Sequence, residues 1–258
     1  IDSPRVADDF VDDMKRRFGE DSPAYFVRVL GSFPPAEEDT VIPVFLIEHA
    51  FNNAIKVHED TIAVWGLDVA RQGGDSSVLC KRQGPMIHPL TVWRNLDLMQ
   101  LSGAVKAEYD NMPPSRRPAE IIIDSNGFGA GVLDRLRELG LPARGLNVSE
   151  RAVAKQTYLN LRAELWFKCK AWLEGMDVSL PKDDALYAEL AGPRYMFTSS
   201  GKIQVESKES MKKRGIRSPD RADALCLALA NDHTTMAFGV AAAGSWAKPI
   251  RRNIRGVV

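Results

Sequence analysis

The sequence predicts an α/β fold in which helices flank a mixed sheet. Three apolar segments, at 61–69, 77–82 and 86–94, follow one another with only short turns between them, as successive strands do. Segments with helical and strand-like patterns alternate after them. Three strands in a row favour an antiparallel start to the sheet.

Short helices are predicted ahead of the sheet. Apolar residues recur at helical spacing between Val6 and Met14, a second helix is expected at 24–30, and a further amphipathic turn or two at 43–51. We therefore expect a small helical linker subdomain at 1–58. Because the first residue is Ile rather than Met, we also expect a fragment of a longer chain.

The main domain is predicted to span 59–233 and to be followed by a flexible basic tail at 234–258. Its later elements are expected in this order: a helix at 98–109, a strand at 120–124, a helix at 129–139, a strand at 143–146, a long helix at 155–173, a strand-like segment at 178–180, a helix at 184–190, a hairpin of strands 194–198 and 202–206, and a last helix ending near 231. Ser218 suits the N-cap of that last helix and Pro219 its first turn. Three strands, a helix, a strand and further alternation are the layout of a ribonuclease-H-like sheet.

The composition limits the classes of function. With 258 residues, 45% of them hydrophobic, the chain can bury one sizeable core. Its 3 cysteines and 4 histidines form no CxxC or HxxxH pattern, which excludes a disulfide framework and a structural zinc site. Any metal would therefore be held by oxygen. No apolar run approaches the roughly 18 residues of a membrane span, so no membrane partner is expected.

The charges are unevenly distributed although the net charge is +0. Residues 1–60 hold 13 acidic and 6 basic side chains, so the rest of the chain is basic. Much of that excess follows position 200, in Lys208, Lys212, Lys213, Arg214, Arg217, Arg221, Lys248, Arg251, Arg252 and Arg255. A basic C-terminal half of the chain suits contacts to phosphates, although an ordinary solvated surface explains these charges equally well.

Two aspartates end apolar strands. Asp68 lies in the strand at 61–69, and Asp124 closes the strand at 120–124. Each has a purely structural alternative, since Asp68 can cap a turn at the rim of the sheet and Asp124 begins a turn-forming Asp-Ser-Asn-Gly sequence. A buried carboxylate nevertheless requires a partner or a metal. If the two strands are neighbours, both carboxylates meet at one edge of the sheet.

The last helix supplies two further acids. Asp220 and Asp223 are three residues apart and therefore share one face of that helix. The helix dipole favours acidic residues in the first turn of a helix, which explains Asp220. It explains Asp223 less well, because Asp223 lies a turn further into the helix. Three or four carboxylates at one point repel one another unless cations lie between them, and Mg²⁺ or Mn²⁺ prefers such oxygen ligands. Two such ions would suit phosphodiester hydrolysis.

These segments resemble the nuclease domain of phage terminase large subunits, with a match over roughly 40–232. The resemblance is carried, in the expected order, by 66–70 (GLDVA), 73–77 (GGDSS), 121–127 (IIIDSNG), 129–133 (GAGVL), 201–208 (GKIQVESK) and 218–225 (SPDRADAL). It implies a ribonuclease-H/RuvC-like fold and a two-metal endonuclease, with Mg²⁺ or Mn²⁺, that cuts concatemeric viral DNA during genome packaging. It also implies double-stranded DNA, the small terminase subunit and the portal protein as partners, in the host cytoplasm.

The resemblance assigns roles to individual residues. Asp68 and Asp124 would be metal ligands from the two strands, and the last helix would supply the third from either Asp220 or Asp223. Outer candidates, which would contact the metal ligands or DNA, are Asp75, Lys202, Lys208, Lys212, Lys213 and Arg214. Among these, Lys208 is the candidate to steer the scissile phosphate, and the hairpin at 194–206 the candidate to touch DNA.

The family's ATPase motor is not represented, because the sequence holds no GxxxxGK[ST] phosphate loop. We therefore expect cleavage without translocation. A RuvC-like resolvase or a transposase would use similar acids, and a resolvase would prefer four-way junctions. The turns after Asp68 and Asp124 also suit the phosphate loops of an actin-like ATPase or sugar kinase, which nucleotide-dependent melting would reveal. A binding module with an inactive acidic cluster is the remaining alternative.

Overall fold

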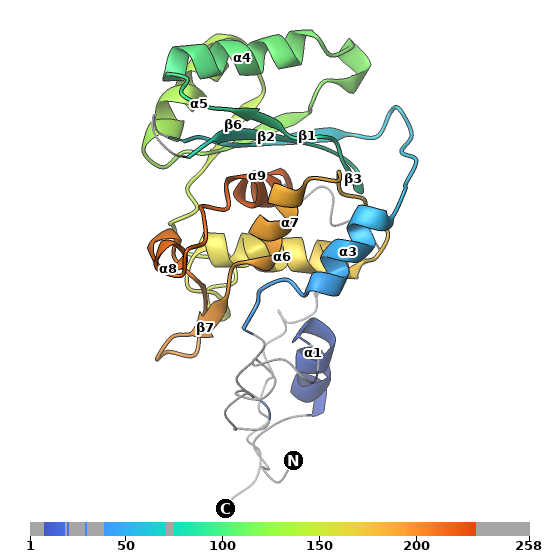
Figure 1. Ribbon diagram of the computed structural model, residues 1–258, viewed down its shortest axis with the longest axis vertical. Helices are drawn as coiled ribbons and strands as arrows, with labels where there is room; N and C mark the ends of the chain where they lie inside the picture. Colours follow the sequence, from blue (N-terminus) through green and yellow to red (C-terminus); the bar gives the residue numbers. More distant parts are fainter. Residues whose placement is uncertain (1–7, 19, 21–28, 30–38, 71–74, 231–258) are drawn as a thin grey trace, which may run out of the picture.

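A mixed sheet between two layers of helices forms the centre of the molecule (Figure 1). The computed structural model describes residues 8–18, 20, 29, 39–70 and 75–230. The strands are β1 (Ala63–Asp68), β2 (Ser77–Gln83), β3 (Met86–Ile87), β4 (Thr91–Trp93), β5 (Glu120–Asp124) and β6 (Ala143–Leu146). Their order is β3-β2-β1-β5-β6, with β4 pairing with β2.

The pairing confirms the predicted antiparallel start. β1 is antiparallel to β2, and β2 is antiparallel to both β3 and β4. β1 then runs parallel to β5, and β5 parallel to β6. Because β1 and β5 are parallel neighbours, their carboxyl ends, Asp68 and Asp124, lie at the same edge of the sheet.

Helices cover both faces of the sheet. They are α1 (Asp8–Phe18), α3 (Val44–Asn52), α4 (Leu98–Asp110), a 3-10 turn (Pro114–Arg116), α5 (Phe128–Glu138), α6 (Leu161–Glu174), α7 (Asp184–Ala191), α8 (Lys208–Lys213) and α9 (Asp220–Ala228). Figure 1 shows α4 and α5 on one face and α9 on the other, with α6 and α7 packed against α9 on its side away from the sheet. Apolar residues fill each interface: Leu67 and Ile121 lie in the core under α4 and α5, and Leu225 in the core on the α9 side.

α9 packs directly on the central strand because Gly66 of β1 has no side chain. A Cβ at this position would lie 2.2 Å from the carbonyl oxygen of Ala224 and 2.4 Å from the amide nitrogen of Ala228. The C-terminal end of the helix is also held by Arg82 of β2, whose Nε donates to the carbonyl oxygen of Ala228 at 2.8 Å. These contacts fix α9, which carries Asp220 and Asp223, against the strand that carries Asp68.

Two of the predicted elements are wrong in extent. The single strand expected at 86–94 is two short strands, β3 and β4, separated at Pro89, which has no amide hydrogen for the ladder. The long helix expected from 155 begins only at Leu161. Asn160 caps it, accepting from the amide of Ala163 at 3.0 Å, while the amide of Leu159 donates to the carbonyl oxygen of Ile203 instead.

The last helix also differs from its prediction. Its N-cap residue is Pro219, so Ser218 does not cap it, and it ends at Ala228 rather than near 231. The hairpin is confirmed as β7 (Tyr195–Phe197) and β8 (Ile203–Val205), with Gly201 at a φ of 73° in its turn. The short helix α8 had no counterpart in the sequence prediction.

The predicted linker at 1–58 lies only partly within the described residues. Of its helices, α1 and α3 are described, while most of the helix expected at 24–30 lies outside the described residues, as does the tail expected at 234–258. α3 packs against α6 and α7, and its Ile47 belongs to the same core as α9. The division at 58 remains a prediction. Among the described residues, no helix combines the length and the apolar character needed to cross a membrane.

Candidate metal-binding active site

Three of the predicted acidic residues line one small pocket. Asp68 of β1, Asp124 of β5 and Asp223 of α9 border a cavity of about 60 Å³. The remaining lining residues are Val148, Arg162, Leu165, Trp166, Lys208, Cys226 and Leu227. The pocket therefore lies where the carboxyl edge of the sheet meets α9 and α6.

Asp68 is the most buried of the three acids that line the pocket. The residue is 8% exposed, and burial raises its pKa well above 3.8, while the Lys208 ammonium acts in the opposite direction. The carboxylates of Asp223, Asp220 and Asp124 raise the pKa further. A charged Asp68 is thus unfavourable in the protein alone and would be favoured by added positive charge.

Asp124 is held by the turn that follows its strand. Its Oδ1 accepts from the amide of Asn126 at 3.1 Å and from the amide of Val148 at 3.4 Å. Burial raises the pKa of Asp124 more than these two hydrogen bonds lower it. Asp124 therefore has both of the roles considered for it. Its Oδ1 makes the hydrogen bonds of the turn predicted from the Asp-Ser-Asn-Gly sequence, and the residue also lines the pocket.

Asp223 has the most partners of the pocket acids. Its Oδ1 accepts from the indole Nε1 of Trp166 at 3.0 Å and lies 3.5 Å from Nη2 of Arg162. Its Oδ2 lies 3.1 Å from Nζ of Lys208. Burial alone would raise the pKa of Asp223, but the nearby Arg162 and Lys208 outweigh it and the pKa is lowered. Asp223 is therefore held as a carboxylate in one orientation.

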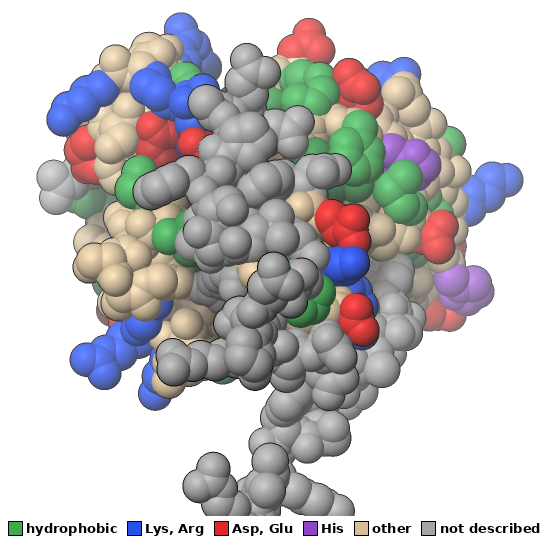
Figure 2. Space-filling model, turned by 90° about the horizontal axis from the view of Figure 1, so that it is seen from below, with side chains coloured by type: hydrophobic (Ala, Val, Ile, Leu, Met, Phe, Trp, Pro, Cys, Tyr) green, Lys and Arg blue, Asp and Glu red, His purple; other side chains and the backbone are tan. Residues whose placement is uncertain are grey.

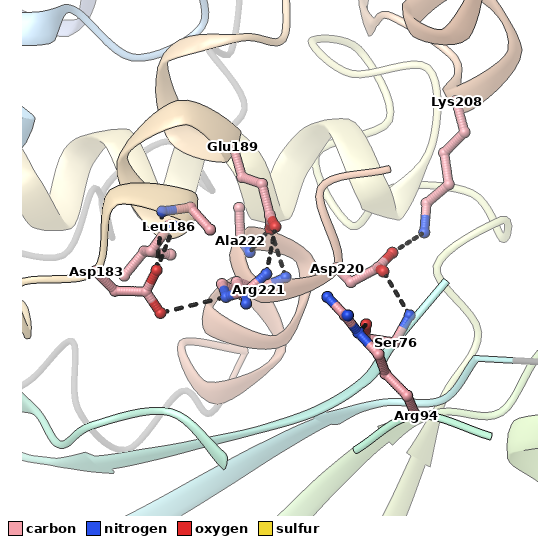
Figure 3. A network of polar contacts seen from close by, with 10 residues as sticks. Ser76, Arg94, Asp183, Leu186, Glu189, Lys208, Asp220, Arg221 and Ala222 are labelled. Carbon is pink, nitrogen blue, oxygen red and sulfur yellow. Dashed lines mark hydrogen bonds and ion pairs between the residues drawn. The ribbon is translucent and has the colours of Figure 1, made fainter. Parts of the chain in front are cut away.

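Asp220 shares the neighbour Lys208 with Asp223, but it accepts a hydrogen bond from a backbone amide of a different segment. Its Oδ2 accepts from the backbone amide of Ser76 at 2.9 Å, and its Oδ1 lies 3.8 Å from Nζ of Lys208 (Figure 3). It is not among the residues that line the pocket. Arg94 joins the same group by donating from Nε to Oγ of Ser76 at 3.2 Å. Both acids of α9 thus contact Lys208, as expected from their shared face, but Asp223 alone of the two borders the cavity.

Lys208 supplies the positive charge of the site. It is the first residue of α8, after the N-cap Ser207, and its ammonium reaches both acids of α9. Burial lowers the pKa of Lys208, but Asp223, Asp68 and Asp220 raise it by more. The ammonium is therefore permanently charged and balances part of the acidic cluster.

The three pocket acids have the ligand atoms that a hard divalent cation prefers, but their side chains are not grouped around a common point. All three pocket acids offer oxygen, the ligand that Mg²⁺ and Mn²⁺ prefer. Within the described part of the chain, however, no three His, Cys, Asp or Glu side chains already lie in a metal-holding arrangement. The Lys208 ammonium contacts Asp223 instead. The positive charge of a bound cation would favour the ionised form of Asp68, whose pKa burial raises.

The other predicted site residues do not line this pocket, and their surroundings differ. Asp75 is exposed, and its charge raises the pKa of Asp220. Lys212 and Lys213 are exposed on α8, and Lys202 is half-buried in the hairpin. Arg214 is engaged within the protein, since its Nε and Nη2 donate to Glu206 at 2.9 and 2.5 Å. Lys and Arg side chains stand out at several places around the molecule seen from below, on both its left and right edges (Figure 2).

The sequence analysis does not single out Arg162 and Trp166 of α6. Both contact Asp223, and Arg162 also donates from Nη1 to the carbonyl oxygen of Glu206 at 2.9 Å. The only signal in the sequence is their spacing of four residues on one helix, which is equally typical of a helix packed in a core.

The comparisons with known proteins agree with this fold. No family model matches the chain. The chain is 25% identical over 226 residues to a "Probable terminase, large subunit" of Enterobacteria phage P7, a match that covers 82% of this chain and 45% of that protein. The chain thus spans less than half the length of this relative.

Nuclease domains of large terminase subunits are among the solved structures that are similar in fold. The nuclease domain of gp2 of bacterial virus Sf6, in a mutant form with manganese and beta-thujaplicinol, has a TM-score of 0.62 and 19% identity over 74% of this chain and 98% of that domain. The large terminase nuclease of thermophilic phage G20c with bound magnesium has a TM-score of 0.57 and 19% identity over 76% of this chain and 98% of its own. The chain therefore has the ribonuclease-H-like fold of these domains.

Proposed function

We propose that the chain is the nuclease part of a phage terminase large subunit, a metal-dependent endonuclease that cuts concatemeric viral DNA during genome packaging. The observation that carries the proposal is the meeting of Asp68, Asp124 and Asp223 at one pocket of a fold shared with large terminase nucleases. Related domains have been solved with manganese and with magnesium, which supports the same cations here. The relative from phage P7 supports the packaging role.

The three pocket acids would hold the metal. When bound, Mg²⁺ or Mn²⁺, which we propose to be a pair of ions, supplies Lewis acidity for phosphodiester hydrolysis. Asp68 and Asp124 hold their oxygens at the rigid sheet edge, and Trp166 and Arg162 keep the Asp223 carboxylate ionised and oriented. Lys208, whose Nζ lies 3.1 Å from Oδ2 of Asp223, would donate to a phosphate oxygen of the substrate.

The DNA would approach over the basic surface beside the pocket. Lys212 and Lys213 project from α8, whose first residue is the pocket residue Lys208, and Lys202 lies in the hairpin. Such side chains bind phosphates without reading sequence. We propose double-stranded DNA as the substrate, and the small terminase subunit and portal protein as partners of the complete protein.

Plasmid digestion tests the activity directly. The purified chain is expected to nick and linearise supercoiled plasmid with Mg²⁺ or Mn²⁺ and to be inactive in EDTA, because the acidic pocket needs a cation. A preference for four-way junctions over duplex would instead favour the resolvase alternative. A folded protein that cuts with neither metal, and melts at a higher temperature with ATP, would favour a nucleotide-binding domain.

Paired variants decide which acid of α9 is the ligand. Asp223→Asn is expected to reduce cleavage by about 100-fold or more, since it removes a carboxylate that borders the pocket. Asp220→Asn is expected to cost about 10-fold at most, because Asp220 acts through Ser76 and Lys208. Cleavage rates at saturating Mn²⁺ measure both. The reverse ranking would assign the ligand to Asp220.

A further inference from the structure

The first turn of α9 is capped by a side chain from another helix. Among the described residues, α9 has no side-chain hydrogen bond from its own N-cap residue, Pro219. Its free amides are satisfied instead by Glu189 of α7, whose Oε2 accepts from the amides of Arg221 at 2.6 Å and Ala222 at 3.1 Å. A helix start that is buried needs such a partner, because unpaired amides are costly there.

Arg221 adds a second connection between the two helices. Its Nη1 donates to Oε1 of Glu189 at 3.1 Å and its Nε to Oδ2 of Asp183 at 3.2 Å (Figure 3). Asp183 is in turn the N-cap of α7, accepting from the amide of Leu186 at 3.0 Å. The start of α9 is thus tied to both the beginning and the later part of α7.

The capped residues lie between the two acids of α9. Glu189 holds positions 221 and 222, while Asp220 is held on the opposite side by the amide of Ser76 (Figure 3). The direction in which a side chain points changes by about 100° per residue along a helix. If the contact with Glu189 were lost, α9 would keep its support from the amide of Ser76 on the opposite side, and a rotation of the helix would move Asp223 away from the pocket. The Glu189 side chain is only 12% exposed, so water replaces it poorly.

We propose that Glu189 is a positioning residue for the metal site: by capping the first turn of α9 it sets the rotation of the helix and aims Asp223 into the pocket. The metal part of this inference rests on the proposed nuclease function. The orientation of Asp223 does not, because it is a property of the protein without metal.

Three variants of the full chain separate positioning from stability. Glu189→Ala removes the cap, and Glu189→Gln keeps an oxygen that can accept from the same amides. Asp97→Ala is the matched control, since Asp97 caps α4 on the other face of the sheet and accepts from the amide of Gln100 at 2.7 Å. Burial raises the pKa of Glu189 to about 7, so measurements at pH 8 keep its carboxylate ionised.

The first readout needs no metal. The indole Nε1 of Trp166 donates to Asp223, so its proton–nitrogen NMR signal, assigned among the 5 tryptophans with Trp166→Phe, reports the orientation of Asp223. The signal is expected to move in Glu189→Ala, to return most of the way in Glu189→Gln, and to stay in place in Asp97→Ala. An unmoved signal in folded Glu189→Ala would overturn the proposal, whatever the protein does with metal.

The second readout is Mn²⁺ binding by calorimetry. Glu189→Ala is expected to weaken binding about 10-fold, as the loss of a group that orients a metal ligand does, while Glu189→Gln recovers most of the affinity. Asp97→Ala should lower the melting temperature without changing the affinity. Equal weakening in Asp97→Ala would reduce the role of Glu189 to stability and overturn the proposal. A wild-type protein that binds no Mn²⁺ would overturn the nuclease function alone, with the indole signal still deciding the role of Glu189.

Discussion

Asp68→Asn is expected to abolish metal-dependent cleavage and, at pH 8, to raise the melting temperature of the metal-free protein. The loss of activity should reach about 1,000-fold, because a bound cation supplies several kcal/mol of charge stabilisation. The gain in stability follows from the raised pKa of Asp68, whose largest cause is burial. Asparagine has nearly the same shape but no charge to bury.

The size of this difference in melting temperature depends on pH. A carboxyl whose pKa is raised in the folded protein contributes stability below the ordinary value of 3.8, and that contribution is lost as the pH rises through the folded pKa. The variant and the wild type should therefore melt at similar temperatures in acid, and the difference should grow toward pH 8. Added Mn²⁺ should reverse the ranking, since it stabilises only the protein that binds it.

Asp134→Asn serves as the control for this comparison. Asp134 is an exposed residue of α5, on the opposite face of the sheet from α9. It should change neither the cleavage rate nor the response of the melting temperature to Mn²⁺. If Asp68→Asn retained wild-type cutting, the assignment of the metal site to this pocket would be wrong.

Gly66→Ala is expected to destabilise the protein by about 3 kcal/mol and to reduce cleavage together with it. The new Cβ would meet backbone atoms of Ala224 and Ala228 at 2.2 and 2.4 Å, and backbone cannot yield as a flexible side chain does. α9 would have to move outward, which separates Asp223 from Asp68. Urea unfolding and plasmid cleavage at a temperature where the variant is folded measure the two effects.

Gly103→Ala is the matched control for Gly66→Ala. Gly103 lies in α4, and a Cβ there has no atom outside its immediate chain neighbours and the helix backbone within 4 Å. Because alanine favours a helix by about 1 kcal/mol over glycine, this variant should be more stable than the wild type and equally active. Unchanged stability in Gly66→Ala would show that α9 does not pack on β1 as described.

Much of the candidate site could be predicted from residue patterns in the sequence. The apolar segments that end in Asp68 and Asp124 predict buried strands with acids at their carboxyl ends, and the pairing of β1 with β5 brings those ends together. The three-residue spacing of Asp220 and Asp223 predicts a shared face, and both contact Lys208. The strand ends and the shared helix face are local features, since the alternation within a strand and the turn of a helix fix them without reference to the rest of the chain.

The rotation of α9 was decided by tertiary contacts. Spacing along the helix cannot say which of its two acids borders the pocket, because the answer depends on the contact at Gly66, the cap from Glu189 and the amide of Ser76. The same holds for Arg162 and Trp166, which reach Asp223 from a helix more than fifty residues earlier in the chain. Helical periodicity defines the relative positions of side chains on one element, whereas the orientation of that element is set by packing and hydrogen bonds with elements distant in sequence.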